Sequence, residues 1–275
     1  MNVLTDPVFS DRVSPLGFIG HKRHVAPELT LSQLPRIDLV LISHNHYDHL
    51  DDASVRALAA QAGGPPLFVV PLGMKAWLAA RGIASAVELE WWQTHFIATA
   101  AEPVEVVLTP MQNWSGRSFT NRLETLWGGY AVFAPDLHLF FTGDTGYSKD
   151  FKDIRWRLAA RQTTAAVGGF DIALIATGAY QPCWFMACQH IDLAEAVQVH
   201  LDLNAKRSLG VHWGTFESTD ESLDQPLIDL VEMRRSKDVA EAGLFVMAIG
   251  EPRQFARGGA SSAITAAPGS EPRAL

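Results

Sequence analysis

The sequence is poor in cysteine and lacks long apolar runs. Its two cysteines, Cys183 and Cys188, do not have the spacing of a C-x-x-C or Cys/His metal motif, and they predict reduced thiols in a reducing compartment. No apolar run reaches the ~18 residues of a membrane span. The first residues, MNVLTDPVFSDR, have no basic region followed by an apolar stretch, so no signal peptide is predicted. The expected location is cytoplasmic, and peripheral contact with a membrane stays open.

Basic runs are also absent, which argues against nucleic acid as a partner. The net charge is −8, and no cluster of Lys or Arg is present to neutralise phosphates. The net negative charge is sufficiently explained by the solubility that it gives the protein. The 275 residues are 48% hydrophobic, which predicts a soluble globular protein with one large or two modest cores. A homodimer is compatible with these bulk properties.

A dense cluster of metal-binding side chains follows a short apolar stretch. Residues 37–42 (IDLVLI) are typical of a buried strand, and His44, His46, Asp48 and His49 come directly after it. Imidazole and carboxylate groups suit zinc, iron or manganese. Since residues two apart in an extended chain point the same way, we expect His44 and His46 to share one ion. Asp48 and His49 can then serve a second ion. Surface histidines before a helix are the alternative interpretation.

The order of the expected elements predicts an α/β fold. Strands and helices alternate up to residue 91 and again from residue 151, and the strands expected between them, 104–109, 125–133 and 138–142, read as antiparallel neighbours. Asp51 or Asp52 is expected to cap the first helix, and Asp192 with Glu195 forms a capping box before a later one.

One domain is the economical interpretation of this order. It extends over residues 1–256, with two sheets between helical layers. Residues 257–275 are rich in Gly, Ala, Ser and Pro without periodicity, and they are expected to be a disordered tail.

A pair of ions needs further ligands at the ends of other strands. Asp144 ends FFTGD, and its two oxygens could bridge ions ~3.5–4 Å apart. His212 ends SLGVH, and His190 precedes the helix that Asp192 is expected to cap. Ordinary capping or solvation is the alternative for a lone His or Asp, but the cluster after residue 42 would otherwise leave its ions undercoordinated. The histidines expected not to be ligands are His21, His24, His95, His138 and His200.

These motifs together resemble a known superfamily. The pattern HNHYDH, GDT and the histidine of VHWGTF is similar to that of the metallo-β-lactamase superfamily. The stretches LPRIDLVLISHNHYDHLD and GAYQPCWFMACQHID resemble the narrower N-acylphosphatidylethanolamine-hydrolysing phospholipase D family. The resemblance implies an αβ/βα four-layer sandwich with a metal pair at one sheet edge. That family usually begins with a strand pair bearing Trp-x-Gly-His, so the first strands are expected to be missing or arranged differently.

The resemblance also implies roles for individual side chains. Six of them would hold two zinc ions: His44 and His46 on the first, Asp48, His49 and His212 on the second, and Asp144 on both. Three would line the substrate phosphate: Tyr47, Gln189 and His190. Asp48 and His190 are the expected catalytic residues, with His190 as an acid or hydrogen-bond donor.

One position departs from the family pattern. The loop after VEVVLTP carries Asn113 where the family has a histidine that binds the first zinc. A neutral amide oxygen is a weak ligand for zinc compared with imidazole. We therefore expect a loosely held first ion, its completion by another metal or water, or an inactivating substitution.

Metal-assisted hydrolysis of a phosphodiester is the leading functional hypothesis. A hydroxide formed between the two ions would attack phosphorus in line, releasing a phosphatidic acid and an N-acylethanolamine-like alcohol from a phospholipid. A lactonase or other carboxyl-ester hydrolase of the same fold is one alternative, and a catalytically impaired metal-binding protein is another. Core packing is the expected role of Trp184, Phe185 and Met186, with acyl-chain contact as the alternative.

Overall fold

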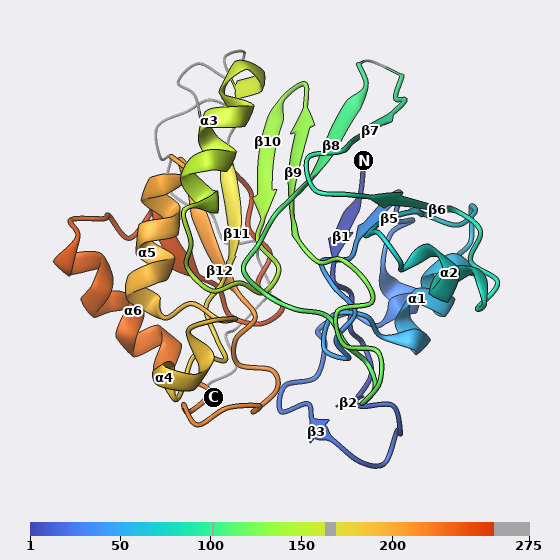
Figure 1. Cartoon of the computed structure of the whole chain (residues 1–275), viewed down its shortest axis with the longest axis horizontal. Coiled ribbons are helices and arrows are strands. Elements are labelled where there is room, and N and C mark those ends of the chain that lie inside the picture. Colours follow the sequence, from blue (N-terminus) through green and yellow to red (C-terminus); the bar gives the residue numbers. More distant parts are fainter. Residues whose placement is uncertain (101, 163–168, 256–275) are drawn as a thin grey trace.

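Two β-sheets pack face to face in the computed structural model, and helices cover the outer face of each (Figure 1). The structure describes residues 1–100, 102–162 and 169–255. The predicted tail at 257–275 lies outside these residues.

The first sheet, as far as the chain is described, has four parallel strands in the order β1-β4-β5-β6. These are β1 (Val3–Thr5), β4 (Leu39–Leu41), β5 (Leu67–Pro71) and β6 (Ala86–Leu89). Strand β1 pairs with β4. Helices α1 (Asp52–Ala59) and α2 (Lys75–Ala79) cover the outer face of this sheet (Figure 1).

The second sheet orders seven strands within the described residues, from β13 through β12, β11, β10, β9 and β8 to β7. Their bounds are β7 (Thr94–Ile97), β8 (Val104–Thr109), β9 (Gly129–Ala134), β10 (Leu137–Phe141), β11 (Ile172–Ala176), β12 (Ser208–Val211) and β13 (Leu244–Val246). Strands β7 to β10 are antiparallel, as predicted for β8 to β10, and β10 to β13 are parallel. Strand β7 was not predicted. The helices on this side are α3 (Asp150–Gln162), α5 (Leu193–Asp202) and α6 (Gln225–Ser236).

Strand β4 is buried on both faces, which explains why its sequence is apolar throughout. Val40 and Ile42 pack on the side of α1 and α2, whereas Leu39 and Leu41 pack between the two sheets. Alternate residues of a strand point to opposite faces, so both apolar layers share this strand. Because this strand is buried on both faces, the start of the loop that follows it is held in a fixed position.

Two helices begin at the side chains that the sequence predicted. Asp51 accepts a hydrogen bond from the Ser54 backbone N–H at the start of α1. Asp192 and Glu195 form the reciprocal capping box of α5. The long N-terminal loop contains the short elements β2 (Arg12–Val13), β3 (His21–Lys22) and η1 (Leu31–Gln33), and the single-turn helix α4 (Cys183–Met186) was not predicted. None of the helices described here has the length and apolar character needed to cross a bilayer.

Tyr130 on β9 connects the two sheets through its fully buried hydroxyl, which lies 2.9 Å from the Ile42 carbonyl oxygen and 3.0 Å from that of Val69. Tyr130→Phe would remove both hydrogen bonds, although the Val69 carbonyl keeps the Ile42 backbone N–H as a donor at 3.2 Å. We expect the free energy of unfolding to fall by about 1–3 kcal/mol. Urea denaturation measures this loss. Tyr147→Phe is the control, because the partly exposed Tyr147 hydroxyl donates to Asp202 and its removal should cost less. An unchanged midpoint for Tyr130→Phe would contradict the prediction.

Candidate metal centre

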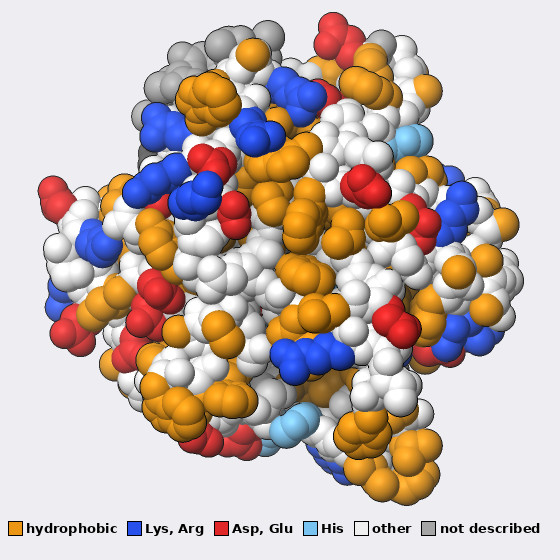
Figure 2. All heavy atoms as spheres, viewed as in Figure 1, with side chains coloured by type: hydrophobic (Ala, Val, Ile, Leu, Met, Phe, Trp, Pro, Cys, Tyr) orange, Lys and Arg blue, Asp and Glu red, His pale blue; other side chains and the backbone are white. Residues whose placement is uncertain are grey.

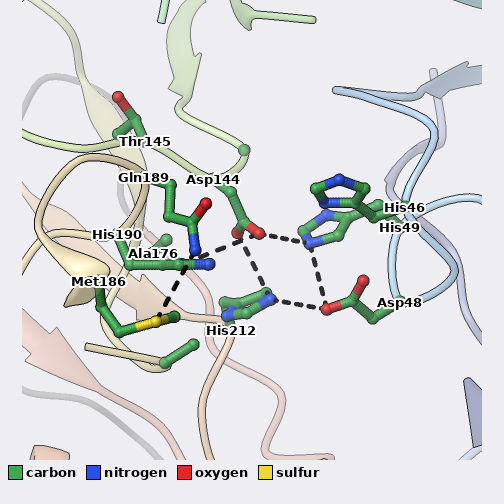
Figure 3. A network of polar contacts seen from close by, with 12 residues as sticks. His46, Asp48, His49, Asp144, Thr145, Ala176, Met186, Gln189, His190 and His212 are labelled. Carbon is green, nitrogen blue, oxygen red and sulfur yellow. Dashed lines mark hydrogen bonds and ion pairs between the residues drawn. The ribbon is translucent and has the colours of Figure 1, made fainter. Parts of the chain in front are cut away.

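Loops that follow three strands bring the predicted metal ligands together at one edge of the sheets. Their side chains are His44, His46, Asp48 and His49 after β4, Asp144 after β10 and His212 after β12. Figure 3 shows Asp144 between the rings of His49 and His212, with His190 and Gln189 on its other side. The carboxyl ends of β4, β10 and β12 therefore meet at this edge.

The six side chains form two groups that share Asp144. His44, His46 and Asp144 make the first group, and Asp48, His49, Asp144 and His212 make the second. Within each group, one ligand atom from every residue lies within 4.8 Å of the others. A third candidate group, Asp6, His44 and His49, was not expected. That the expected six side chains bind two ions stays a prediction, and a carboxylate that belongs to both of their groups is placed to bridge two ions.

Asp144 lies at the centre of the contacts. Its Oδ2 is 3.0 Å from Nε2 of His49 and 3.7 Å from Nε2 of His44, and its Oδ1 is 3.4 Å from Nε2 of His212. Asp48 is the remaining member of the second group. Its Oδ2 lies 3.5 Å from Nε2 of His212 and 3.7 Å from Nε2 of His49. All these atoms face a common space.

Buried polar atoms without hydrogen-bond partners show that the cluster fits metal ions. In the described part of the chain these atoms include Nε2 of His46, Oδ1 of Asp144 and Nδ1 of His190. Buried groups of this kind nearly always have a partner in native proteins. A divalent ion such as zinc would satisfy imidazole nitrogen and carboxylate oxygen together.

Burial and neighbouring charges set the protonation of the ligands. Burial, with the charges of His49 and His46, lowers the pKa of His44 well below its ordinary value, and burial lowers the pKa of His46 to about 4. Burial opposes ionisation of Asp144, but His212 and His49 hold the pKa of its carboxyl well below the usual range. Neutral imidazoles and an ionised carboxylate are the forms that bind metal. Burial also opposes protonation of His49, yet Asp144 and Asp48 raise its pKa, so an ion bound there displaces a proton.

Asp6 orients His49, one of the predicted ligands, and the sequence did not reveal this role. Its carboxylate lies 2.6 Å from Nδ1 of His49 and accepts hydrogen bonds from the backbone N–H and hydroxyl of Ser43, at 2.7 and 2.5 Å. The Ser43 hydroxyl in turn lies 2.9 Å from Nδ1 of His44. A carboxylate on the outer nitrogen of a ligand histidine fixes its ring and tautomer. The sequence does show an acidic residue directly after β1. Its contact with His49 could be predicted only by knowing that β1 pairs with β4.

Replacing Asp6 should weaken metal binding without removing any of the six predicted ligands. For Asp6→Asn we expect about 10–100-fold lower affinity, the range typical of such outer partners. Competition with a chelating indicator measures this affinity. Asp11→Asn is the matched control, because Asp11 lies in the same loop with an exposed side chain that belongs to neither ligand group. Equal affinities of the two variants would refute the assigned role.

The loop after β8 holds the ligand loop in place. Arg117 Nη1 donates to the carbonyl oxygens of Leu50 and Asn45 at 2.7 and 2.9 Å, and its guanidinium lies 3.9 Å from the centroid of the Tyr47 ring. The Tyr47 hydroxyl donates to the Arg117 carbonyl oxygen at 2.8 Å. Tyr47 is thus engaged within the protein, and its contact with a phosphate stays a prediction. The role of Arg117 was also not predicted, because a sequence does not show which backbone carbonyl groups a distant side chain contacts.

Asn113 lies in the same loop, between two residues that contact the site. The backbone N–H of Gln112 donates to the Thr145 hydroxyl at 3.1 Å, and the Trp114 ring lies 4.4 Å from the His46 ring, centroid to centroid. The Asn113 Nδ2 atom is buried without a hydrogen-bond partner among the described residues. Its expected place beside the smaller ligand group stays a prediction.

The two groups should bind metal with unequal affinity, because one offers three ligands and the other four. Asn113→His would add an imidazole, and we expect the weaker binding step to tighten by at least about tenfold, since even outer partners change affinity ~10–100-fold. Zinc titration with measurement of bound metal resolves the two steps. Equal steps in the unmodified protein, or no gain in the variant, would contradict this placement of Asn113.

Gln189 and His190 come from the segment between α4 and α5. The His190 ring stacks on His212 at a centroid distance of 5.8 Å, and its Nδ1 lies 3.9 Å from Oδ2 of Asp144. Gln189 Oε1 accepts a hydrogen bond from Nε1 of Trp114 at 2.5 Å. This contact turns the amide nitrogen of Gln189 towards Asp144 and His190 (Figure 3).

Core packing was expected for Trp184, Phe185 and Met186, and this expectation is wrong for the first two. Trp184 and Phe185 are 85% and 58% exposed, whereas Met186 is buried. The reason is that α4 is a single turn at the surface, so only one of its faces can pack. The histidines expected not to be ligands lie outside both groups of the described chain; among them, His138 is buried near the start of β10 and His200 contacts Ser208 from α5.

Comparison with known proteins agrees with this geometry. The β-lactamase superfamily domain matches residues 1–213. The Caenorhabditis elegans N-acyl-phosphatidylethanolamine-hydrolyzing phospholipase D 1 is 34% identical over 257 residues, which are 90% of this chain and 69% of that protein. This chain belongs to that family of the metallo-β-lactamase superfamily.

Further matches support the assignment of family and fold. The mitochondrial N-acyl-phosphatidylethanolamine-hydrolyzing phospholipase D of Saccharomyces cerevisiae is 35% identical over 228 residues, and the chain spans 46% of its length. The isothiocyanate hydrolase from Delia radicum gut bacteria superposes with a TM-score of 0.64 at 16% identity and 90% coverage of both chains. The predicted αβ/βα sandwich is confirmed, and the superfamily is one of metal-dependent hydrolases.

Proposed function

We propose that this protein is a zinc-dependent phosphodiesterase of the phospholipase D type that acts on a phospholipid. The observation that carries the proposal is the pair of ligand groups joined by Asp144, with Gln189 and His190 beside it. The relationship to phospholipases of the same family supports the choice of phosphodiester over lactone or carboxyl ester.

Asp48 is the proposed acceptor of the proton from the attacking water. Two ions held by the ligand groups would supply Lewis acidity towards a phosphoryl oxygen and would lower the pKa of water. Burial opposes ionisation of Asp48, but the charge of His49 and a hydrogen bond from His212 lower its pKa. Asp48 therefore stays an ionised carboxylate that is also partly exposed to the incoming reactants.

Gln189 and His190 are proposed to hold the phosphate. The indole N–H of Trp114 donates to the Gln189 carbonyl oxygen. Among the described residues the amide nitrogen of Gln189 has only the Met186 sulfur as a partner, at 3.7 Å, so its N–H groups can donate to a phosphoryl oxygen. Burial lowers the pKa of His190 against the opposing charge of Asp144, which favours a neutral ring near pH 7. A neutral His190 donates a hydrogen bond to the charge that grows on the equatorial oxygens.

Exposed apolar side chains near the site are proposed to contact lipid. Trp184 and Phe185 project from α4, close in sequence to Gln189, and Phe18 and Ile19 project from the β2–β3 loop with exposures of 73% and 55%. Figure 2 shows apolar side chains gathered over these two regions at the lower edge of the molecule. Contact with acyl chains or a lipid surface would give these side chains a partner.

Hydrolysis of three substrates by one metal-loaded preparation tests the proposed function. We expect cleavage of bis(p-nitrophenyl) phosphate and of an N-acylphosphatidylethanolamine, with phosphatidic acid as a product. His190→Asn should lower kcat by about 10²-fold or more, the lower end of what one positioned proton donor contributes. His95→Asn is the control, since His95 on β7 belongs to neither ligand group. Cleavage of a lactone without any phosphodiester would overturn the proposal.

A further inference from the structure

A cavity of about 230 Å³ opens beside the larger ligand group. Much of its wall comes from residues 213–226, and Arg23 of the N-terminal loop also lines it. Five carboxylates belong to the same wall: Asp6, Asp48, Asp144, Glu217 and Glu221. A hydrocarbon chain in this cavity would strip water from charged groups, which is costly. An apolar surface elsewhere is better suited to the N-acyl chain of the proposed substrate.

Three tryptophans, Trp91, Trp114 and Trp127, provide such a surface, called here the tryptophan band. Nε1 of Trp91 donates to the Trp127 carbonyl oxygen at 2.6 Å, and the two ring centroids are 5.7 Å apart. Nε1 of Trp127 donates to the Met111 carbonyl oxygen at 2.9 Å, and that of Trp114 donates to Gln189. Because every indole N–H of the band is bonded within the protein, the exposed parts of these rings are apolar.

The band starts at the proposed phosphate position and extends away from α4. Trp114 bonds to Gln189, whose amide nitrogen contacts the Met186 sulfur of α4. Figure 3 shows Thr145 on the other side of Gln189 from Met186, and the Thr145 hydroxyl accepts a hydrogen bond from Gln112 in the segment of the band. Figure 2 shows apolar side chains along the middle of one face, where Figure 1 places the segments after β6 and β8. Apolar surfaces therefore leave the phosphate position in two directions.

The distribution of charge along the band matches an amphiphilic ligand. The Arg122 guanidinium lies 4.6 Å from the centroid of the Trp114 ring, at the end of the band beside Gln189. In the described part of the chain, none of the cation–ring contacts involves Trp91 or Trp127. An anionic phosphate near Arg122 and a hydrocarbon chain over the other two rings would fit both ends.

We propose that the tryptophan band binds the N-acyl chain of the headgroup alcohol, while the two glycerol-linked chains stay at α4 and the β2–β3 loop. This inference rests on the proposed function and adds a place for the chain that leaves with the alcohol. Trp91 and Trp127 are then specificity-determining residues, because they contact a group that takes no part in the reaction. Burial of apolar surface grows with chain length, so the band favours long N-acyl chains over short ones.

Two phospholipids with the same glycerol chains, N-palmitoylphosphatidylethanolamine and N-acetylphosphatidylethanolamine, test this assignment in the same detergent micelles. The unmodified protein should show the lower KM for the N-palmitoyl substrate. Trp91→Ala should raise that KM about tenfold, because less apolar surface is then buried against the chain. Its kcat and its KM for the N-acetyl substrate should stay near those of the unmodified protein.

Three further variants separate chain binding from folding and from lipid contact. Trp91→Phe keeps an apolar ring and should recover most of the preference for the long chain. Trp156→Ala is the matched control, because Trp156 is 78% exposed on α3 and lies outside the band, and it should change neither KM. Trp184→Ala should raise both KM values alike. Metal content and thermal stability are measured for each variant. An equal rise of both KM values with Trp91→Ala, or no preference in the unmodified protein, would overturn the assignment.

A binding measurement distinguishes this proposal from the proposed phosphodiesterase activity. Calorimetric titration of the metal-loaded protein with N-decanoylethanolamine and with N-acetylethanolamine requires no turnover. Tighter binding of the N-decanoyl compound that Trp91→Ala weakens at least about threefold supports the band even where bis(p-nitrophenyl) phosphate is not cleaved. Equal binding of the two compounds, or an unchanged affinity in Trp91→Ala, refutes the band and leaves the phosphodiesterase proposal standing.

Discussion

The site depends on one buried carboxylate that must stay ionised. Asp144 is 4% exposed, and a buried charge is costly unless opposite charges and hydrogen-bond donors surround it. Its Oδ2 is 3.0 Å from Nε2 of His49 and its Oδ1 is 3.4 Å from Nε2 of His212, and both histidines lower its pKa. The same arrangement makes Asp144 the member shared by both ligand groups. Without it, the chain would have two partial sites instead of a joined pair.

Both ligand groups contain side chains from both sheets, so the site also depends on how the sheets pack. His44 and His46 follow β4 of the first sheet, whereas Asp144 and His212 follow β10 and β12 of the second. Tyr130 lies on the second sheet and reaches carbonyl groups of the first at the level of this edge. The apolar layer between the sheets therefore sets the distance between ligands.

Local patterns in the sequence were sufficient to predict much of this arrangement. The cluster from His44 to His49 was predicted because its members follow one another along the chain after a strand that is apolar on both faces. Asp144 and His212 were predicted because each ends an apolar run. The caps of α1 and α5 were predicted because a cap and its helix are adjacent in sequence.

Residues whose roles come from pairing between distant segments were not predicted. Asp6 reaches His49 because β1 pairs with β4, and Arg117 reaches Leu50 across many intervening residues. Strand β7 lacks the apolar alternation of a half-buried strand, since its residues are partly buried or exposed. Trp184 looked like a core residue because side-chain type alone does not say which face of a short turn meets the protein.

The cavity and the ligand cluster draw mainly on different segments of the chain. The ligand loop is held by β4, Asp6 and Arg117, whereas most of the cavity wall belongs to residues 213–226 and to the N-terminal loop with Arg23. Insertions or substitutions in those wall segments can reshape the pocket while leaving the ligand positions intact. Evolution of a new substrate range in this fold is thus freer in those wall segments than at Asp6, which lines the same cavity but also contacts His49.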